Sequence, residues 1–141
     1  MAYSMKPIAL TASATLSFET HGEGVVKCDA AAGMTVTLPS TTGSGGSFLI
    51  FFGTTVTSND YIVQVTTTDI FSGGVSMSTD IAGTNLLTAA TTDTITMDGA
   101  EKGGLIGSWL RVTDVAAGVW ALEGFLKTTG VEATPFSAAV S

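Results

Sequence analysis

The chain has 141 residues, enough for one domain with a hydrophobic core of its own. Only 12% of the residues are charged and the net charge is −7, so a nucleic-acid partner, which needs clustered lysine and arginine, is not expected. A single cysteine, Cys28, excludes a disulfide scaffold, and no apolar run approaches the roughly 20 residues that span a bilayer, so no membrane partner is expected either.

Threonine or serine alternates with apolar residues along much of the chain, most clearly in residues 11–18, 34–38 and 94–97. A period of two places one set of side chains on a buried sheet face and the other toward solvent or a neighbour. No segment shows a helical period of useful length. The predicted fold class is therefore all-β: a two-sheet sandwich or jelly roll-like domain of about eight strands with long glycine- and threonine-rich loops.

In chain order, residues 1–10 are predicted to be an N-terminal arm, because Pro7 interrupts them and chain ends are loose unless they dock. Residues 11–127 are predicted to form the single β-sandwich domain, and residues 128–141 a C-terminal tail. The expected strands are residues 11–18, 25–28, 34–38, 47–52, 61–67, 92–97, 108–113 and 119–127.

Glycine-rich segments separate these strands. Residues 40–46, with the sequence STTGSGG, are predicted to be a flexible loop. Residues 69–87 are predicted to be an irregular excursion with one or two short strands, because Gly73, Gly74 and Gly83 interrupt them. The glycine clusters lack the lysine of a phosphate-binding P-loop, which favours loops and corners between strands.

Residues 47–52 are apolar on both faces, a pattern typical of a strand that is central or lies against a partner. Trp109 and Trp120 fit two readings, core residues or markers of an intersubunit surface. The apolar residues of the arm form a third group, because exposed apolar arms usually order on a partner. The interaction residues expected from these three features are Tyr3, Met5, Ile8, Phe48, Ile50, Phe52 and Trp109.

Reactive side chains are few. His21 is the only histidine, which excludes a zinc site built from several histidines of one chain. Cys28 alternates with Val26 on what reads as a core face, where a lone cysteine is usually inert packing. The loop carboxylates lack the spacing of a calcium loop. We therefore expect no catalytic residues, no metal site, no cofactor and no enzymatic activity.

Several motifs occur together in one order: TVTLPSTTGSGGS at residues 35–47, DIFSG at 69–73, and GGLIGSWLRVTDVAAGVWALEGFL at 103–126, followed by TTGVEATPFS. Over residues 25–137 the chain resembles capsid decoration, or cement, proteins of tailed bacteriophages and related head-fibre and tail-fibre modules. The resemblance implies an all-β fold, homotrimers at capsid three-fold positions and no enzymatic activity.

The leading hypothesis is thus a virion structural protein. It would be made in the host cytoplasm, trimerise, and bind the major capsid protein on the outside of a phage head to stabilise the shell. The alternative is a tail- or head-fibre module that recognises host surface glycan. Sparse charges on a β protein support the first, since uncharged strand edges invite pairing with other subunits.

Overall fold

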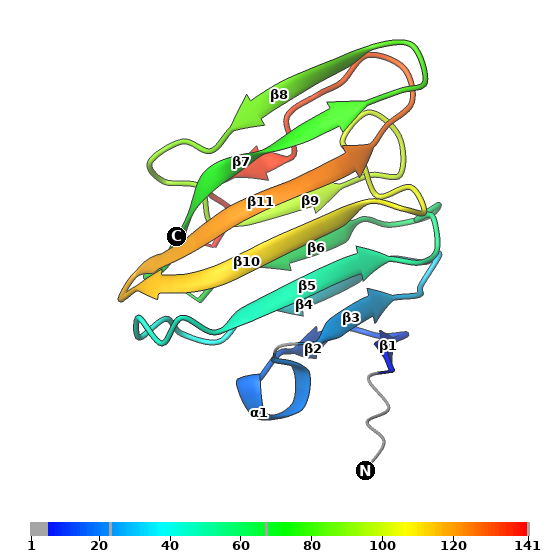
Figure 1. The fold of residues 1–141 in the computed structure, drawn as a ribbon. Coiled ribbons are helices and arrows are strands. Elements are labelled where there is room, and N and C mark those ends of the chain that lie inside the picture. The colour runs from blue at the N-terminus through cyan, green and yellow to red at the C-terminus, as the bar shows by residue number, and fades with distance from the viewer. Residues whose placement is uncertain (1–5, 23, 67, 141) are drawn as a thin grey trace.

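Two β-sheets lie face to face in the computed structural model, which describes residues 6–22, 24–66 and 68–140 (Figure 1). Sheet A contains, in spatial order, β1 (Ile8–Leu10), β3 (Val25–Cys28), β5 (Ser47–Phe52), β10 (Trp109–Ala116), β11 (Val119–Lys127), β7 (Ile70–Ser78) and β8 (Gly83–Leu87). Sheet B contains β12 (Phe136–Ser137), β9 (Thr94–Met97), β6 (Tyr61–Gln64), β4 (Met34–Thr37) and β2 (Ala14–Thr15). One helical turn, α1 (Phe18–His21), precedes β3. The predicted all-β, two-sheet sandwich is confirmed.

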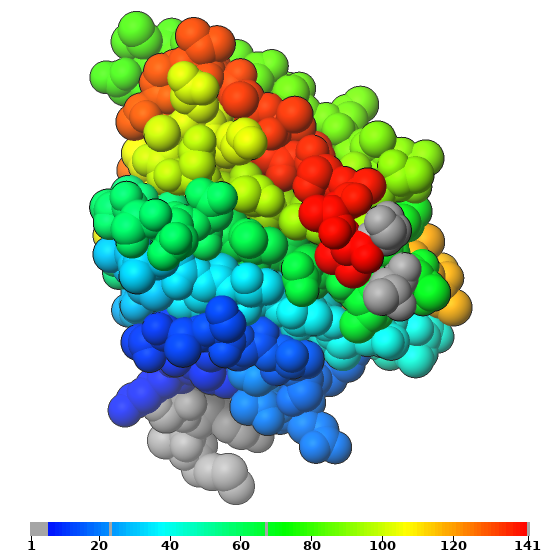
Figure 2. Space-filling view, turned by 180° about the vertical axis from the view of Figure 1, so that it is seen from behind, coloured from blue at the N-terminus to red at the C-terminus, as the bar shows by residue number. Residues whose placement is uncertain are grey.

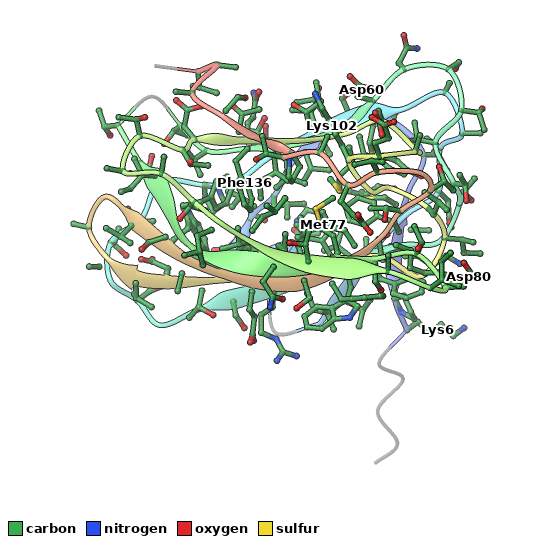
Figure 3. The ribbon with its side chains drawn as sticks, turned by 90° about the horizontal axis from the view of Figure 1, so that it is seen from above. Lys6, Asp60, Met77, Asp80, Lys102 and Phe136 are labelled. Carbon is green, nitrogen blue, oxygen red and sulfur yellow. The ribbon has the colours of Figure 1, made fainter. Side chains whose placement is uncertain are left out.

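The core lies between the inner faces of the two sheets, as the view along the sandwich shows (Figure 3). The core side chains come from alternate positions along each strand. Phe48, Ile50 and Phe52 on β5 are fully buried, and Tyr61 and Val63 face them from β6. Burying a large apolar side chain contributes about 1.5–3 kcal/mol relative to leaving it in water. The inner faces therefore hold the two sheets together.

From β1 to β6 the chain crosses between the sheets after every strand. A strand can pair in parallel with an earlier one only after such a crossover, and here the intervening strand of the other sheet provides it. Parallel pairing therefore joins β1 to β3, β3 to β5, β2 to β4 and β4 to β6. The sandwich in this way departs from a jelly roll, whose strands are antiparallel.

The described part of the predicted N-terminal arm is partly a strand. Residues Ile8 to Leu10 pair in parallel with β3, where Leu10 lies opposite Cys28. The side chain of Leu10 packs against the core, and this burial explains why the segment docks instead of remaining free. Residues 1–5 lie outside the described residues.

The single strand predicted over residues 11–18 is instead the two-residue strand β2 followed by α1. Ser17 begins the helical turn, because its Oγ accepts a hydrogen bond from Thr20 N at 3.3 Å. His21 Nδ1 in turn accepts one from Ser17 N at 3.0 Å. This reciprocal capping supplies local partners that a strand would otherwise need from a neighbour.

The predicted C-terminal tail also belongs in part to the sandwich. Strand β12 pairs antiparallel with β9, and Pro135 O accepts a hydrogen bond from Thr96 N at 2.8 Å. Val140 N donates to Asp93 Oδ1 at 3.1 Å. The segment runs across the back of the molecule, coloured red in Figure 2. It therefore covers one edge of sheet B.

Residues 69–87 are more regular than their glycines predict. They form β7 and β8, an antiparallel hairpin at the edge of sheet A. Gly73 has a φ of 146°, and a Cβ there would overlap the carbonyl oxygen of Leu122 on β11. The glycine allows β7 to approach β11 closely and does not interrupt the strand.

Residues 40–46 are held in place by a buried carboxylate distant in sequence. Asp114, on β10, accepts hydrogen bonds from the backbone N–H groups of Thr42, Gly43 and Ser44, and from Ser44 Oγ, at 2.8–3.2 Å. Burial raises the pKa of Asp114, but these hydrogen bonds outweigh it, so the pKa lies below its ordinary value. The loop predicted to be flexible is therefore anchored.

Candidate binding surfaces

Three of the expected interaction residues lie in the core. Phe48, Ile50 and Phe52 are fully buried between the sheets of the single chain. The sequence showed that β5 is apolar on both faces, but not which set of side chains points inward. A partner on this strand would have to contact the opposite set, which includes Leu49 and Phe51 and is half-buried.

The remaining expected residues lie apart from one another. Tyr3 and Met5 are outside the described residues. Ile8 is half-buried in β1, at the edge of sheet A. Trp109 is half-buried at the start of β10, near the middle of the same sheet. Trp120 is fully buried, so the two tryptophans divide between the two readings: Trp120 is core and Trp109 reaches the surface.

Aromatic side chains cross the outer face of sheet A in a row. The strand register places Trp109 opposite Phe51 of β5 on one side and opposite Phe125 of β11 on the other. Alternation puts all three on the face away from the core, the face turned toward the viewer in Figure 1. Tryptophan and phenylalanine are enriched where surfaces bind partners.

Two hollows flank Trp109. The first, about 210 Å³, is lined by Leu49, Phe51, Trp109 and Arg111 and is mainly apolar. The second, about 290 Å³, lies on the side of β7 and β8, where its lining includes Ser76, Asn85, Leu87 and Glu123. Trp109 thus separates an apolar hollow from one with polar groups.

The charged pair beside Trp109 is exposed. Arg111 Nη1 lies 3.5 Å from Glu123 Oε1 across β10 and β11, and the two side chains are 49% and 63% exposed. Exposed pairs of this kind contribute about 0–1 kcal/mol. Both side chains therefore remain available to a ligand at low cost.

A second candidate surface lies at one end of the sandwich. Three aliphatic side chains stand out in its loops: Ile81 is 91% exposed, Val131 79% and Ile106 54%. We call these three residues the aliphatic end. Val131 belongs to the apolar residues of the predicted C-terminal tail, whereas Ile81 and Ile106 are not predicted from the sequence. The signal for these two is an isolated aliphatic residue within a polar or glycine-rich loop.

The three loops of the aliphatic end are neighbours because their strands are. Lys127, at the end of β11, pairs with Ser78 at the end of β7. Lys127 N also donates a hydrogen bond to Ser108 Oγ, next to the start of β10, at 2.9 Å. The three loops thus lie at the same end of the sandwich.

The reactive side chains are occupied or buried. Burial, with a contribution from the Asp29 charge, raises the pKa of Cys28 to about 12. His21 Nδ1 is engaged in capping α1. Within residues 6–22, 24–66 and 68–140, no group of three histidine, cysteine or acidic side chains is placed to hold a metal ion.

We expect the native Cys28 thiol to resist Ellman's reagent at pH 8, because only a trace of thiolate exists at that pH and the side chain is fully buried. Unfolding in guanidinium should expose it to complete reaction. The absorbance of the coloured thiolate that the reagent releases follows both reactions. Rapid modification of the folded chain would contradict this expectation.

Comparison with known proteins yields no match to a family model, a curated protein or a solved structure. In the described part of the chain, no helix is long and apolar enough to cross a membrane.

Proposed function

We propose that the chain is a virion structural protein, a capsid decoration protein that binds the outside of a phage head and stabilises the shell. The observation that carries the proposal is the aliphatic end, where the exposed side chains of Ile81, Val131 and Ile106 lie in loops at the same end of the sandwich. The resemblance of the ordered motifs to those of decoration proteins supports it from the sequence.

Exposed aliphatic side chains favour a partner for a physical reason. Covering a large aliphatic side chain removes apolar surface from water and contributes about 1.5–3 kcal/mol when burial is complete. Single exposed apolar residues are common on proteins, but several large ones at the same end of a domain favour an interaction site there. The sandwich behind this group has a continuous core, suited to bridging neighbouring capsid subunits.

The charges around the aliphatic end indicate the character of its partner. Carboxylates of Asp80, Asp98 and Glu101 lie in its loops, with Lys102 and Lys127 as the nearby cations. Acidic groups around an apolar centre favour a partner with basic groups around its own apolar patch. We accordingly assign this end to the capsid protein and not to a second copy of the chain.

The double substitution Ile81→Ser and Val131→Ser should weaken binding to undecorated heads by about tenfold or more, equivalent to ~1.4 kcal/mol. Both residues are exposed, so the melting temperature should change little. Co-sedimentation of the purified chain with heads measures the affinity.

Val115→Ser is the matched control. Val115 is 52% exposed, close to the value for Ile106, but lies by the turn between β10 and β11 at the opposite end of the sandwich. It should leave head binding unchanged. Equal binding by wild type and the double variant would overturn the assignment of the aliphatic end.

Separately, mass photometry should show the predicted trimer, and a monomer at micromolar concentration would count against trimerisation in solution.

The alternative function is a head- or tail-fibre module that recognises glycan. A specific observation favours it: Trp109 stands half-exposed beside a hollow that contains Ser76, Asn85 and Glu123. Stoichiometric presence on purified heads would favour decoration, whereas sugar binding by a chain absent from heads would favour the fibre module.

A further inference from the structure

We infer that the hollow between Trp109 and β8 binds one pyranose ring of a neutral glycan. The inference supplies a site for the alternative function, and it holds whether or not the chain decorates a capsid, because this hollow lies on the outer face of sheet A and the aliphatic end does not.

The shape of the hollow suits a single ring. Trp109 forms one wall, and Leu87, 80% exposed on β8, forms another. Backbone at Gly74 and Gly124, where no side chain intrudes, contributes to its lining. Its volume of about 290 Å³ is just below the range of small-molecule sites, roughly 300–1,000 Å³. That size admits one sugar ring more readily than an extended oligomer.

The polar groups of the hollow match the hydroxyl groups of a sugar. Ser76 Oγ and Asn85 Oδ1 are hydrogen-bonded at 2.8 Å, and this bond orients the Asn85 amide. The NH₂ group of Asn85 then has no hydrogen-bond partner among the described residues. Glu123 adds a carboxylate acceptor whose contact with Arg111 is long, at 3.5 Å. Each sugar hydroxyl both donates and accepts, so the amide donor and the carboxylate acceptor can be satisfied by one ring.

The indole of Trp109 matches the other side of the ring. A pyranose has one face covered by C–H groups, and the electron-rich face of an aromatic ring attracts such groups while both are removed from water. An apolar wall with a few convergent polar groups is the general form of a small-molecule site. Trp109 would thus provide affinity, and Asn85, Ser76 and Glu123 would provide orientation.

The local charge favours a neutral ligand. Glu123 borders the hollow, its partner Arg111 borders the apolar hollow on the other side of Trp109, and the chain carries a net charge of −7. A carboxylate or sulfate on the sugar would meet repulsion from Glu123. Uncharged hexoses and N-acetylhexosamines are therefore the expected class.

The test uses the full chain and a panel of methyl glycosides of glucose, galactose, mannose and N-acetylglucosamine, with sodium glucuronate as the charged comparison. Acrylamide quenching reports on Trp109 selectively, because Trp120 is fully buried. At least one neutral glycoside should protect Trp109 from quenching at millimolar concentration. Saturation-transfer NMR, which needs no tryptophan, then compares the variants.

Trp109→Ala should reduce the NMR-measured affinity by about tenfold or more. Asn85→Ala should reduce it less, and the control Thr113→Ala, on the same face of β10, should leave it unchanged. Unaltered melting of each variant shows that the fold is intact. No protection by any neutral glycoside, equal binding by Trp109→Ala, or tighter binding of glucuronate would overturn the inference. Head binding by Trp109→Ala tests decoration independently, because the aliphatic end is untouched.

Discussion

Replacing Phe48 with alanine is expected to lower the free energy of unfolding by about 3–5 kcal/mol, the usual cost of removing a buried phenylalanine. Phe48 is fully buried, its ring stacks on Phe18 with centroids 4.8 Å apart, and it tilts against Trp120 at 5.9 Å. Alanine would leave a cavity between the two sheets that the remaining rings cannot fill without leaving their packed positions. Guanidinium denaturation measures the change.

Phe51→Ala is the matched control, since it makes the same chemical change three residues along the same strand. Phe51 lies on the outer face and is only half-buried, so a loss of about 1 kcal/mol is expected. Similar losses for the two variants would contradict the assignment of Phe48 to the core. If Phe48→Ala changed the oligomeric state but left the stability of the subunit unchanged, Phe48 would be an interface residue, as the sequence predicts.

The second large effect is expected at Asp114. Its carboxylate accepts hydrogen bonds from Thr42, Gly43 and Ser44, and the residue is fully buried. Asp114→Ala would remove this acceptor for all three residues at once and should cost about 2–4 kcal/mol, since hydrogen bonds to a charged group contribute about 1.5–3 kcal/mol and the loop would lose its anchor. Faster hydrogen exchange at the three amides should accompany the loss in denaturation experiments.

Asp98→Ala is the comparison for Asp114. Asp98 also accepts two backbone hydrogen bonds, from Ala100 N at 2.9 Å and Lys102 N at 3.0 Å, but it is exposed. Water can replace an exposed acceptor, so the loss should be about 1 kcal/mol or less. An equal cost at the two positions would show that burial does not set the contribution of Asp114.

Asp114 also gives stability a defined pH dependence. Its pKa in the folded chain is lowered below the ordinary value of about 3.9, so its contribution is complete above that value. As pH falls from about 4 through the folded pKa, protonation removes the contribution. The difference in stability between wild type and Asp114→Asn should therefore shrink over this acidic range and remain constant from pH 5 to about 7. A constant difference down to pH 2 would contradict it.

Several elements could be predicted because their information is local. Strands β3, β4 and β5 match the predicted residues closely, since each has apolar alternation or a continuous apolar run that ends at a loop. The antiparallel pairing of β10 with β11 follows from two strands joined by a short turn. Trp109 could likewise be singled out as a residue with a possible surface role.

Other features depend on contacts between distant residues. From the sequence alone, the glycines of β7 predict an interruption of the strand. The structure shows that Gly73 instead allows close approach to Leu122 of β11. The composition of residues 40–46 predicts a flexible loop. The loop is anchored because Asp114, about 70 positions later in the chain, accepts its hydrogen bonds. Both candidate surfaces arise in the same way, because strand order places Trp109 and Asn85 around one hollow and brings the loops of the aliphatic end to one end of the sandwich.

The sequence by itself determined that the chain is all-β, because a period of two is a property of neighbouring residues and sets sheet faces directly. It also determined that β5 is apolar on both sides. Only the tertiary structure decided that Phe48, Ile50 and Phe52 face the core while Leu49 and Phe51 face outward. Alternation fixes relative orientation within one strand, whereas the choice of inward face depends on which other strands cover it.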